Sequence, residues 1–163
     1  MAQYKLAVDV ERCIGCHSCE VACKQEFNLP VGPQWIRVIK VGPRKIGKKL
    51  KMDFVPIFCK HCEKPPCIKV CPENALRKRP DGIVLVDKEK CTGCQLCIDA
   101  CPINAPQLNP DEGVVGFCNF CAHRIDDGLE PICKIVCPAR CIYFGDVNEI
   151  NKMMQEKKVK DLF

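Results

Sequence analysis

The chain has 163 residues, and 17 of them are cysteine, a share far above that of ordinary soluble proteins. Because cysteine counts among the 47% of hydrophobic residues, the remaining apolar core is small and needs covalent or metal cross-links. The formal charge of +5 would suggest an acidic partner or nucleic acid. Its short apolar runs predict no membrane insertion, which needs about 20 apolar residues.

The secondary-structure signals are short and alternate with groups of cysteines. Alternating apolar residues favour strands, and the residues after the cysteine groups favour short helices that end near a Cys-Pro step. In chain order, the expected strands are 4–8, 35–41, 52–58 and 83–86. The expected helices are 18–26, 66–70, 95–100 and 129–136, with a polar terminal helix at 148–158. Such elements predict an α+β fold rich in loops, without an extended sheet.

All but one of the cysteines fall into four groups. The first and third groups follow C-x2-C-x2-C-x3-C, the second follows C-x2-C-x4-C-x3-C-P, and the fourth follows C-x2-C-x11-C-x3-C-P. Residues 8–23 line up with residues 86–101, and the second group is echoed by the fourth, so the order is A, B, A′, B′. The groups are Cys13, Cys16, Cys19 and Cys23; Cys59, Cys62, Cys67 and Cys71; Cys91, Cys94, Cys97 and Cys101; and Cys118, Cys121, Cys133 and Cys137.

This spacing indicates iron-sulfur clusters. In a C-x2-C-x2-C loop three thiolates converge on one [4Fe-4S] cluster, and the fourth cysteine ligates the other cluster of a pair. Disulfides fit poorly, because the number of cysteines is odd, the spacing is too tight for unstrained bridges and residues 1–12 show no secretory signal. A zinc site of four cysteines has no use for the third close cysteine. Rieske ligation would need two histidines, whereas His17, His61 and His123 each lie beside a complete cysteine group and are expected to be partly exposed.

The span from Asp9 to Asp146 resembles the four-cluster electron-transfer (beta) subunits of molybdenum and tungsten bis-pterin oxidoreductases. That group includes dimethyl sulfoxide reductase, polysulfide reductase and formate dehydrogenase. Similar polyferredoxin subunits accompany tungsten aldehyde and aromatic acyl-CoA oxidoreductases. The matching residues include 59–67 (CKHCEKPPC), 118–121 (CNFC) and 143–146 (YFGD).

The resemblance implies four [4Fe-4S] clusters, each held by three cysteines of one group and one from another. Two bacterial-ferredoxin-like modules would then form, one from residues 1–30 with 110–146 and one from 52–109, with a basic β-hairpin insertion at 31–51 and a helix or tail at 147–163. We number the implied ligand sets. They are set 1, Cys13, Cys16, Cys19 and Cys137; set 2, Cys23, Cys118, Cys121 and Cys133; set 3, Cys59, Cys62, Cys67 and Cys101; and set 4, Cys71, Cys91, Cys94 and Cys97.

The function implied is electron transfer between other redox centres, without catalysis by this chain. Catalysis would lie in a large Mo/W-pterin subunit, with a further redox subunit as a second partner. The expected compartment is the cytoplasm. The alternative is the periplasm, reached by export together with a partner that carries the signal. A free-standing polyferredoxin shuttle is the alternative. An iron-sulfur nucleic-acid-binding or sensor protein is a third class, but thiolate-bound clusters would make the assembled protein acidic, so we expect no nucleic-acid binding.

Two features stand outside this pattern. Cys141 is the seventeenth cysteine, and the repeats place Ala75 and Ala105 at its position, which predicts a small buried packing residue, with a ligand or reactive thiol as the alternative. Residues 44–51 carry five cations. They are expected to form a solvated hairpin tip or a docking surface for an acidic partner, and they lack the aromatic residues that stack on nucleic acid.

Overall fold

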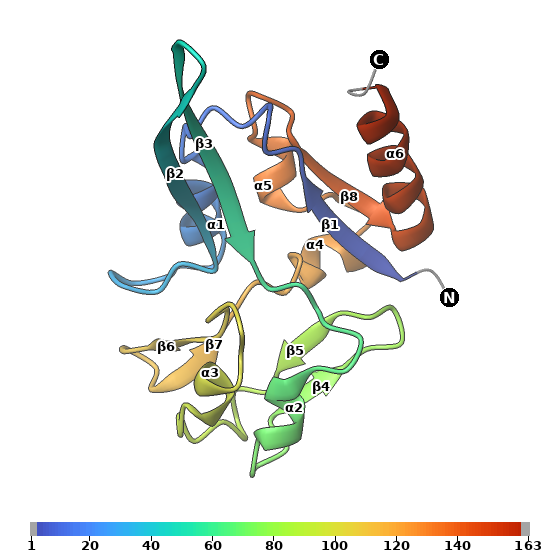
Figure 1. Cartoon of the computed structure of the whole chain (residues 1–163). Helices are drawn as coiled ribbons and strands as arrows, with labels where there is room; N and C mark the ends of the chain where they lie inside the picture. Colours follow the sequence, from blue (N-terminus) through green and yellow to red (C-terminus); the bar gives the residue numbers. More distant parts are fainter. Residues whose placement is uncertain (1–2, 161–163) are drawn as a thin grey trace.

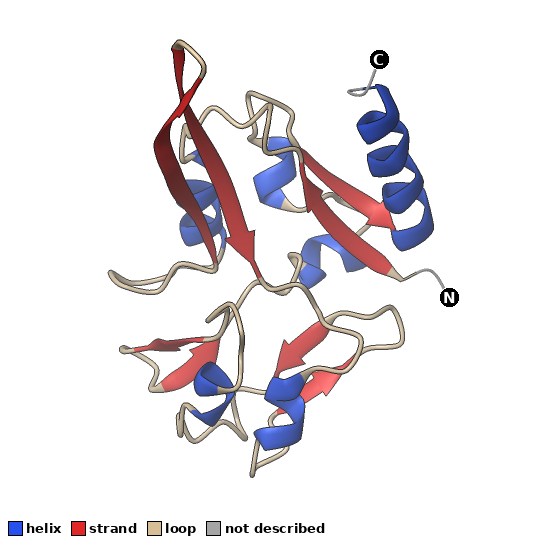
Figure 2. Cartoon of the chain, in the orientation of Figure 1, coloured by secondary structure: helices blue, strands red, loops and turns tan. Residues whose placement is uncertain are grey.

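The computed structural model describes residues 3–160 and shows a small protein of mixed helices and strands (Figures 1 and 2). Residues 161–163 of the expected C-terminal tail and residues 1–2 lie outside the described part. The strands are β1 (Tyr4–Val8), β2 (Ile36–Ile46), β3 (Lys49–Phe58), β4 (Leu76–Lys78), β5 (Val84–Val86), β6 (Gln107–Asn109), β7 (Val114–Gly116) and β8 (Ile142–Asp146). The helices are α1 (Ser18–Glu26), α2 (Pro66–Val70), α3 (Leu96–Asp99), α4 (Ala122–Asp126), α5 (Ile132–Ile135) and α6 (Val147–Lys160).

The described strands pair as four separate antiparallel ribbons: β1 with β8, β2 with β3, β4 with β5, and β6 with β7. The first ribbon joins the two ends of the chain, because Tyr4 lies opposite Asp146 and Val8 opposite Ile142. Helix α6 packs against this ribbon (Figure 1). The expectation of a fold without an extended sheet therefore agrees with these ribbons, whereas β2 and β3, with 11 and 10 residues, are longer than expected. Within residues 3–160, none of the helices has the length and apolar character needed to cross a membrane.

The basic segment 44–51 differs from its prediction. The sequence predicts a turn between two short strands, but most of the segment continues β2 and β3, with Arg44 opposite Lys51 and Ile46 opposite Lys49. Asp53 explains how two cations can face each other, because its carboxylate pairs with Arg44 at 2.5 Å and with Lys51 at 3.2 Å. The tip of the hairpin thus stands clear of the neighbouring helices and loops (Figure 1).

The helix predicted at 129–136 begins later, after Pro131, because the residue before a proline avoids the helical conformation. The helix predicted at 95–100 begins at Leu96, since Gln95 is left-handed with φ 65°. Helix α4 is not among the predicted elements, although Gly128 with φ 75° supplies a stop signal soon after it. Strands β4, β6 and β7 are also absent from the prediction, because each has only three residues and, unlike β5 in the apolar run 83–86, none lies in a longer apolar run that would reveal it.

The buried residues form two cores. The first core is the cluster around Leu6, Ile36, Phe120 and Ile142, which draws residues from both ends of the chain. The second core consists of Leu76, Val84, Cys97, Val115 and Phe117, all from the middle of the chain. Cysteines belong to both cores, so the packing of each region is built around thiols.

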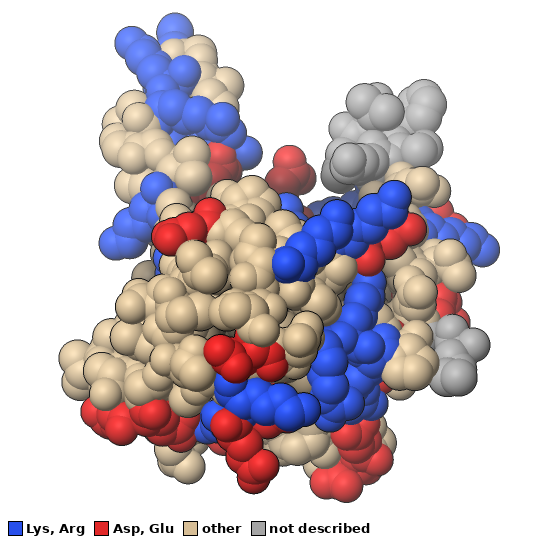
Figure 3. All heavy atoms as spheres, turned by 90° about the horizontal axis from the view of Figure 1, so that it is seen from below, with Lys and Arg blue, Asp and Glu red and all other residues tan. Residues whose placement is uncertain are grey.

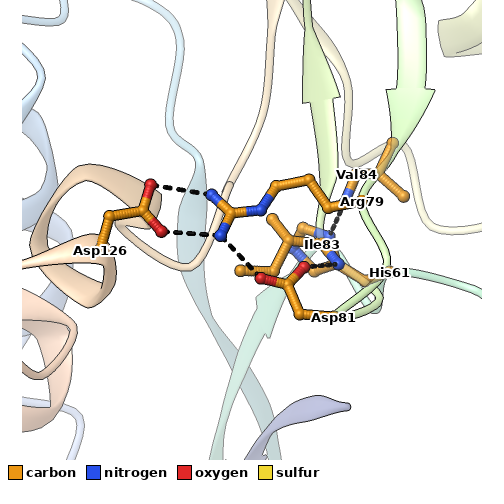
Figure 4. Close-up of polar contacts among 6 residues, drawn as sticks. All are labelled: His61, Arg79, Asp81, Ile83, Val84 and Asp126. Atoms are coloured by element: carbon orange, nitrogen blue, oxygen red, sulfur yellow. Dashed lines mark hydrogen bonds and ion pairs between the residues drawn. The ribbon is translucent and has the colours of Figure 1, made fainter. Parts of the chain in front are cut away.

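Polar contacts connect the regions around the two cores (Figure 4). Arg79, just after β4, donates two hydrogen bonds to Asp126 at the end of α4, at 2.7 and 2.9 Å. The same guanidinium pairs with Asp81 at 2.7 Å. The neighbouring backbone is tied as well, since the N–H of Tyr4 donates to the carbonyl of Asp81 at 3.0 Å. The two regions therefore share a defined contact face.

Candidate functional site

The cysteine loops of the two repeats adopt the same backbone conformation. Gly15 and Gly93 have φ values of 66° and 67°, and His17 and Gln95 have values of 61° and 65°. These left-handed residues turn the chain between successive cysteines, which glycine allows without strain. Asp9 stabilises the start of the first loop by accepting the backbone N–H of Glu11 at 3.2 Å. Asp87 accepts the N–H of Glu89 at 3.1 Å in the same way, so the repeat in the sequence is also a repeat in structure.

Three of the four implied cysteine sets each line one cavity. Each cavity draws three cysteines from one loop and a fourth from a distant part of the chain. Counted with their open mouths, the cavities measure about 300, 600 and 350 Å³ for sets 1, 3 and 4, respectively. Their cysteines are Cys13, Cys16, Cys19 and Cys137 for set 1; Cys59, Cys62, Cys67 and Cys101 for set 3; and Cys71, Cys91, Cys94 and Cys97 for set 4.

The thiols of set 2 lie close enough to influence one another electrostatically. Burial raises the pKa of Cys23 to about 12, and Cys121 adds to this shift. Burial also raises the pKa of Cys118, with Cys133 and Cys23 as the next causes. The pKa of Cys133 rises through burial, then through Cys121 and Cys23. The structure therefore brings together Cys23 from α1 and the three cysteines of the 118–133 segment.

The donor set fits an iron-sulfur cluster. Among residues 3–160, His, Cys, Asp and Glu side chains form no group of three that could hold a single metal ion. The four thiols of sets 1, 3 and 4 instead surround a cavity, as a multi-atom group requires. Soft thiolates favour iron-sulfur clusters, and backbone N–H groups point at several of the sulfurs. The N–H of Val115 donates to Cys91 and that of Ala105 to Cys101, both at 3.4 Å.

Desolvation opposes free thiolates at these sites. Burial raises the pKa of Cys19 and Cys59 to about 12 and that of Cys97 to about 11. Without a bound cation these thiols stay protonated at neutral pH, because a buried negative charge is costly. Binding of iron supplies the positive charge that allows the thiolates to form, so loading of the site and deprotonation of its cysteines are coupled.

The three histidines differ from one another, which the sequence did not predict. The side chains of His17 and His123 are 39% and 51% exposed and pair with Glu20 and Glu26. His61 is buried, which corrects the expectation that it is partly exposed. Its Nδ1 accepts the backbone N–H of Val84 at 2.8 Å (Figure 4). Burial lowers the pKa of His61 to about 3, so the ring is neutral. A histidine that packs on Phe120, with ring centroids 3.8 Å apart, is a core residue.

Cys141 is buried, as expected for a packing residue, but it is not remote from the cysteine sets. It lines the same cavity as set 1, and its Sγ lies 3.5 Å from the Sγ of Cys137. Burial opposes ionisation of Cys137, yet hydrogen bonds from the backbone N–H and the thiol of Cys141 lower the pKa of Cys137. Cysteine spacing alone does not predict this contact.

Neighbouring sets are also close to one another. Cys19 of set 1 raises the pKa of Cys23 in set 2, after burial and Cys121. Cys59 of set 3 contributes to the raised pKa of Cys118 in set 2, mainly a burial effect. Cys67 of set 3 is the first charge that adds to the burial effect on Cys97 in set 4. These pairwise influences link set 1 to set 2, set 2 to set 3 and set 3 to set 4.

A family model described as a 4Fe-4S dicluster domain matches residues 50–147, and a second model with the same description matches residues 12–75. The first match alone covers more than half of the chain. The chain belongs to the 4Fe-4S dicluster family. Together the two matches include all sixteen grouped cysteines.

Individual relatives of this 4Fe-4S dicluster protein are similar over most of their length. The thiosulfate reductase electron transfer subunit PhsB of Salmonella typhi is 42% identical, over 96% of the present chain and 84% of the relative. The B subunit of the anaerobic dimethyl sulfoxide reductase of Escherichia coli is 38% identical, over 92% and 77%. The formate dehydrogenase iron-sulfur subunit of Wolinella succinogenes is 37% identical, over 98% and 89%.

Proposed function

We propose that this protein is the electron-transfer subunit of an oxidoreductase complex and carries four [4Fe-4S] clusters. The relatives are subunits of thiosulfate reductase, dimethyl sulfoxide reductase and formate dehydrogenase, which supports a role beside a catalytic partner. We assign catalysis to a large subunit with a Mo- or W-pterin site, and the present chain connects that site to an electron donor or acceptor. Bound [4Fe-4S] clusters accept and release single electrons.

The ligand assignment is the one given for sets 1 to 4. It is supported by the cavities that sets 1, 3 and 4 line and by the mutual proximity of the thiols in set 2. With these ligands, sets 1 and 2 belong to a ferredoxin-like module made from the ends of the chain. Sets 3 and 4 belong to one made from its middle. The connection between the first and last strands through the β1–β8 ribbon supports this layout.

The order of the four sets is the observation that carries the proposed function. Sets 1 and 4 lie at the ends of the row, and each presents an exposed cysteine, Cys16 and Cys94. Ile14 and Leu96, beside them, are 61% and 47% exposed. In set 2, inside the row, all four cysteines are buried. Set 3, the other inner set, also presents an exposed cysteine, Cys62. The row therefore has one fully buried set and three sets with exposed cysteines at which electrons can pass to or from partners.

We propose the β2–β3 hairpin as a docking element for a partner. Lys and Arg side chains gather on this projection at one edge of Figure 3. Lys45, Lys48 and Lys49 have no ion-pair partner among the residues that the structure describes, whereas Arg44 and Lys51 pair with Asp53. Leu50 is 76% exposed beside these cations. Exposed apolar and cationic groups together favour an acidic partner surface with an apolar centre.

Metal analysis tests the cofactor. We expect about 16 irons and 16 acid-labile sulfides per chain after anaerobic purification. A zinc content near four, without visible absorbance, would contradict the proposed function. Copurification separates the subunit from a polyferredoxin shuttle, because a dedicated subunit elutes in a fixed ratio with a large catalytic chain. Fractionation of the native cells tests the cytoplasmic location that we propose, with coexport to the periplasm as the other outcome.

Charge reversal tests the hairpin. The double variant Lys48→Glu/Lys49→Glu should slow association with the catalytic subunit and reduce the salt dependence of the rate. Lys152→Glu, a single charge reversal at an exposed position on α6, is the control away from the hairpin. Equal association rates for the charge-reversed variant and the control would mean that the hairpin is a solvated tip without a docking role. Binding of the loaded protein to duplex DNA at physiological salt would instead favour a nucleic-acid protein.

A further inference from the structure

In the second, third and fourth cysteine groups, the position four residues after the last cysteine carries different residues. Ala75 follows Cys71, Ala105 follows Cys101, and Cys141 follows Cys137. All three residues are buried, with exposed fractions of 2%, 5% and 2%. Two of these positions are filled by a methyl group, so packing at this position does not require a thiol.

Cys141 is a fifth thiol at a site where sets 3 and 4 have four. It lines the cavity of set 1 together with Cys13, Cys16, Cys19 and Cys137. Its Sγ lies 3.5 Å from that of Cys137, and Cys13 is also close enough to influence it. In the cavities of sets 3 and 4 the corresponding residues, Ala105 and Ala75, present only a methyl group. Cys141 is therefore part of a cluster of thiols and not an isolated cysteine.

The backbone of Cys141 is held in place beside the cavity, so an exchange of ligands needs only its side chain to move. The carbonyl of Cys141 accepts the N–H of Asp9 at 2.8 Å, and Ile142, the next residue, begins β8 and lies opposite Val8. These contacts fix its Cα beside the cavity. A change of χ1 between staggered rotamers is then enough to redirect Sγ.

We propose that Cys141 is a reserve ligand of set 1, able to replace Cys137 on the same iron. This inference rests on the proposed function, because it requires a [4Fe-4S] cluster at set 1. In the exchange the Fe–S bond to Cys137 breaks and an Fe–S bond to Cys141 forms. The thiol proton of Cys141 passes to the leaving Cys137 across the 3.5 Å contact, and no electron is transferred.

A reserve ligand suits this end of the row. Ile14 beside the cavity is 61% exposed and Cys16 is exposed, so solvent and oxidants reach set 1. A cluster that loses one cysteine can lose the iron that the cysteine held, which leaves a three-iron cluster. A second thiol within reach of the same iron keeps the cluster intact when Cys137 is oxidised or displaced.

Matched ligand substitutions test the inference. Cys137→Ala and Cys71→Ala each remove the cysteine of a Cys-Pro step, but only Cys137 has a thiol four residues later. Cys71→Ala should lose about one iron per chain and show the EPR signal of an oxidised three-iron cluster. Cys137→Ala should retain its iron and show at least tenfold less of this signal. The double variant Cys137→Ala/Cys141→Ala should behave like Cys71→Ala.

Other outcomes separate the possible failures. An equal three-iron signal in Cys137→Ala and Cys71→Ala would overturn the reserve ligand and leave the proposed function intact. Wild-type protein without iron-sulfur clusters would overturn the proposed function itself. If Cys137→Ala does not fold, Cys141→Ala decides the matter in the native ligand set. It should form the three-iron cluster at set 1 several-fold faster than wild type under ferricyanide, and equal rates would contradict the inference.

Discussion

The regions around the two cores hold their cysteines differently. In sets 1 and 2, beside the first core, six of eight cysteines are buried, whereas in sets 3 and 4 only Cys97 is buried. The first region also contains the β1–β8 ribbon, the long hairpin and α6, while the second has only three-residue strands and short helices. Packing therefore contributes much of the order in the first region. In the second region, the bound metal must contribute most of it.

Removal of iron should cause the largest loss of structure, and it tests whether the two regions depend on metal to different degrees. The chain without metal should lose most of its structure, because its apolar core is small. Hydrogen exchange should show residual protection only in β1, β8 and α6, and none in β4 to β7. Native-like near-UV dichroism with a cooperative thermal transition of the metal-free chain would show that packing alone is sufficient.

Gly15 and Gly93 allow a paired test of the two repeats. A Cβ on Gly93 would lie 2.2 Å from the backbone oxygen of Gly113, whereas a Cβ on Gly15 would meet the ring of Phe54 at 2.3 Å. Both residues have positive φ, so each alanine also costs about 1–2 kcal/mol of backbone strain. Gly93→Ala should lose the cluster of set 4, measured as about four irons per chain.

Phe54 distinguishes the two glycine variants. Truncation of this side chain removes the atoms that a Cβ at Gly15 would meet, so Phe54→Ala should restore iron to Gly15→Ala. The obstacle at Gly93 is backbone, which no side-chain change can remove. Full iron content in Gly93→Ala would show that the third cysteine loop can shift, and the comparison of the repeats would fail.

Substitution of a buried and of an exposed histidine should change the free energy of unfolding by different, smaller amounts. His61→Leu leaves the backbone N–H of Val84 without its acceptor, which should cost about 1–3 kcal/mol. His123→Leu removes a side chain that is 51% exposed and should cost less than about 0.5 kcal/mol. Urea denaturation of the loaded protein, with the slope held comparable, measures both. Equal losses would mean that His61 does not support β5.

Loss of the ion pair between Arg79 and Asp126 should cause the smallest loss of stability. The pair connects the two regions, but the side chain of Asp126 is 52% exposed and solvent screens such pairs. Asp126→Asn should therefore lower the denaturation midpoint less than His61→Leu does, and the loss should shrink further at high salt. A larger loss than that of His61→Leu would identify this pair as the main contact between the regions.

Much of the site could be predicted because cysteine spacing reflects local geometry. The loops around Cys13 and Cys91 repeat in sequence and therefore in backbone, down to the left-handed residues at His17 and Gln95. Local patterns also located β1, α1 and α2, whose bounds agree with the prediction. These features depend on neighbouring residues, which a sequence displays directly.

Long-range contacts could not be predicted from the same patterns. The burial of His61 depends on Phe120 and Val84, and the contact between Arg79 and Asp126 spans 47 positions. The thiol contact of Cys141 requires knowledge of where the side chain of Cys137 points. Strands β6 and β7 form only because each pairs with the other. Such features depend on the assembled fold and not on spacing along the chain.

The proposed electron-transfer role is tested most directly by counting electrons. A reductive titration of the purified, loaded chain, followed by EPR spin quantitation, should show uptake of about four electrons, one per cluster. The spins should interact magnetically, because neighbouring cysteine sets lie close together. Uptake of no electrons would contradict the iron-sulfur account. Uptake of one or two electrons by fully loaded protein, with no interaction between spins, would contradict the row of four clusters.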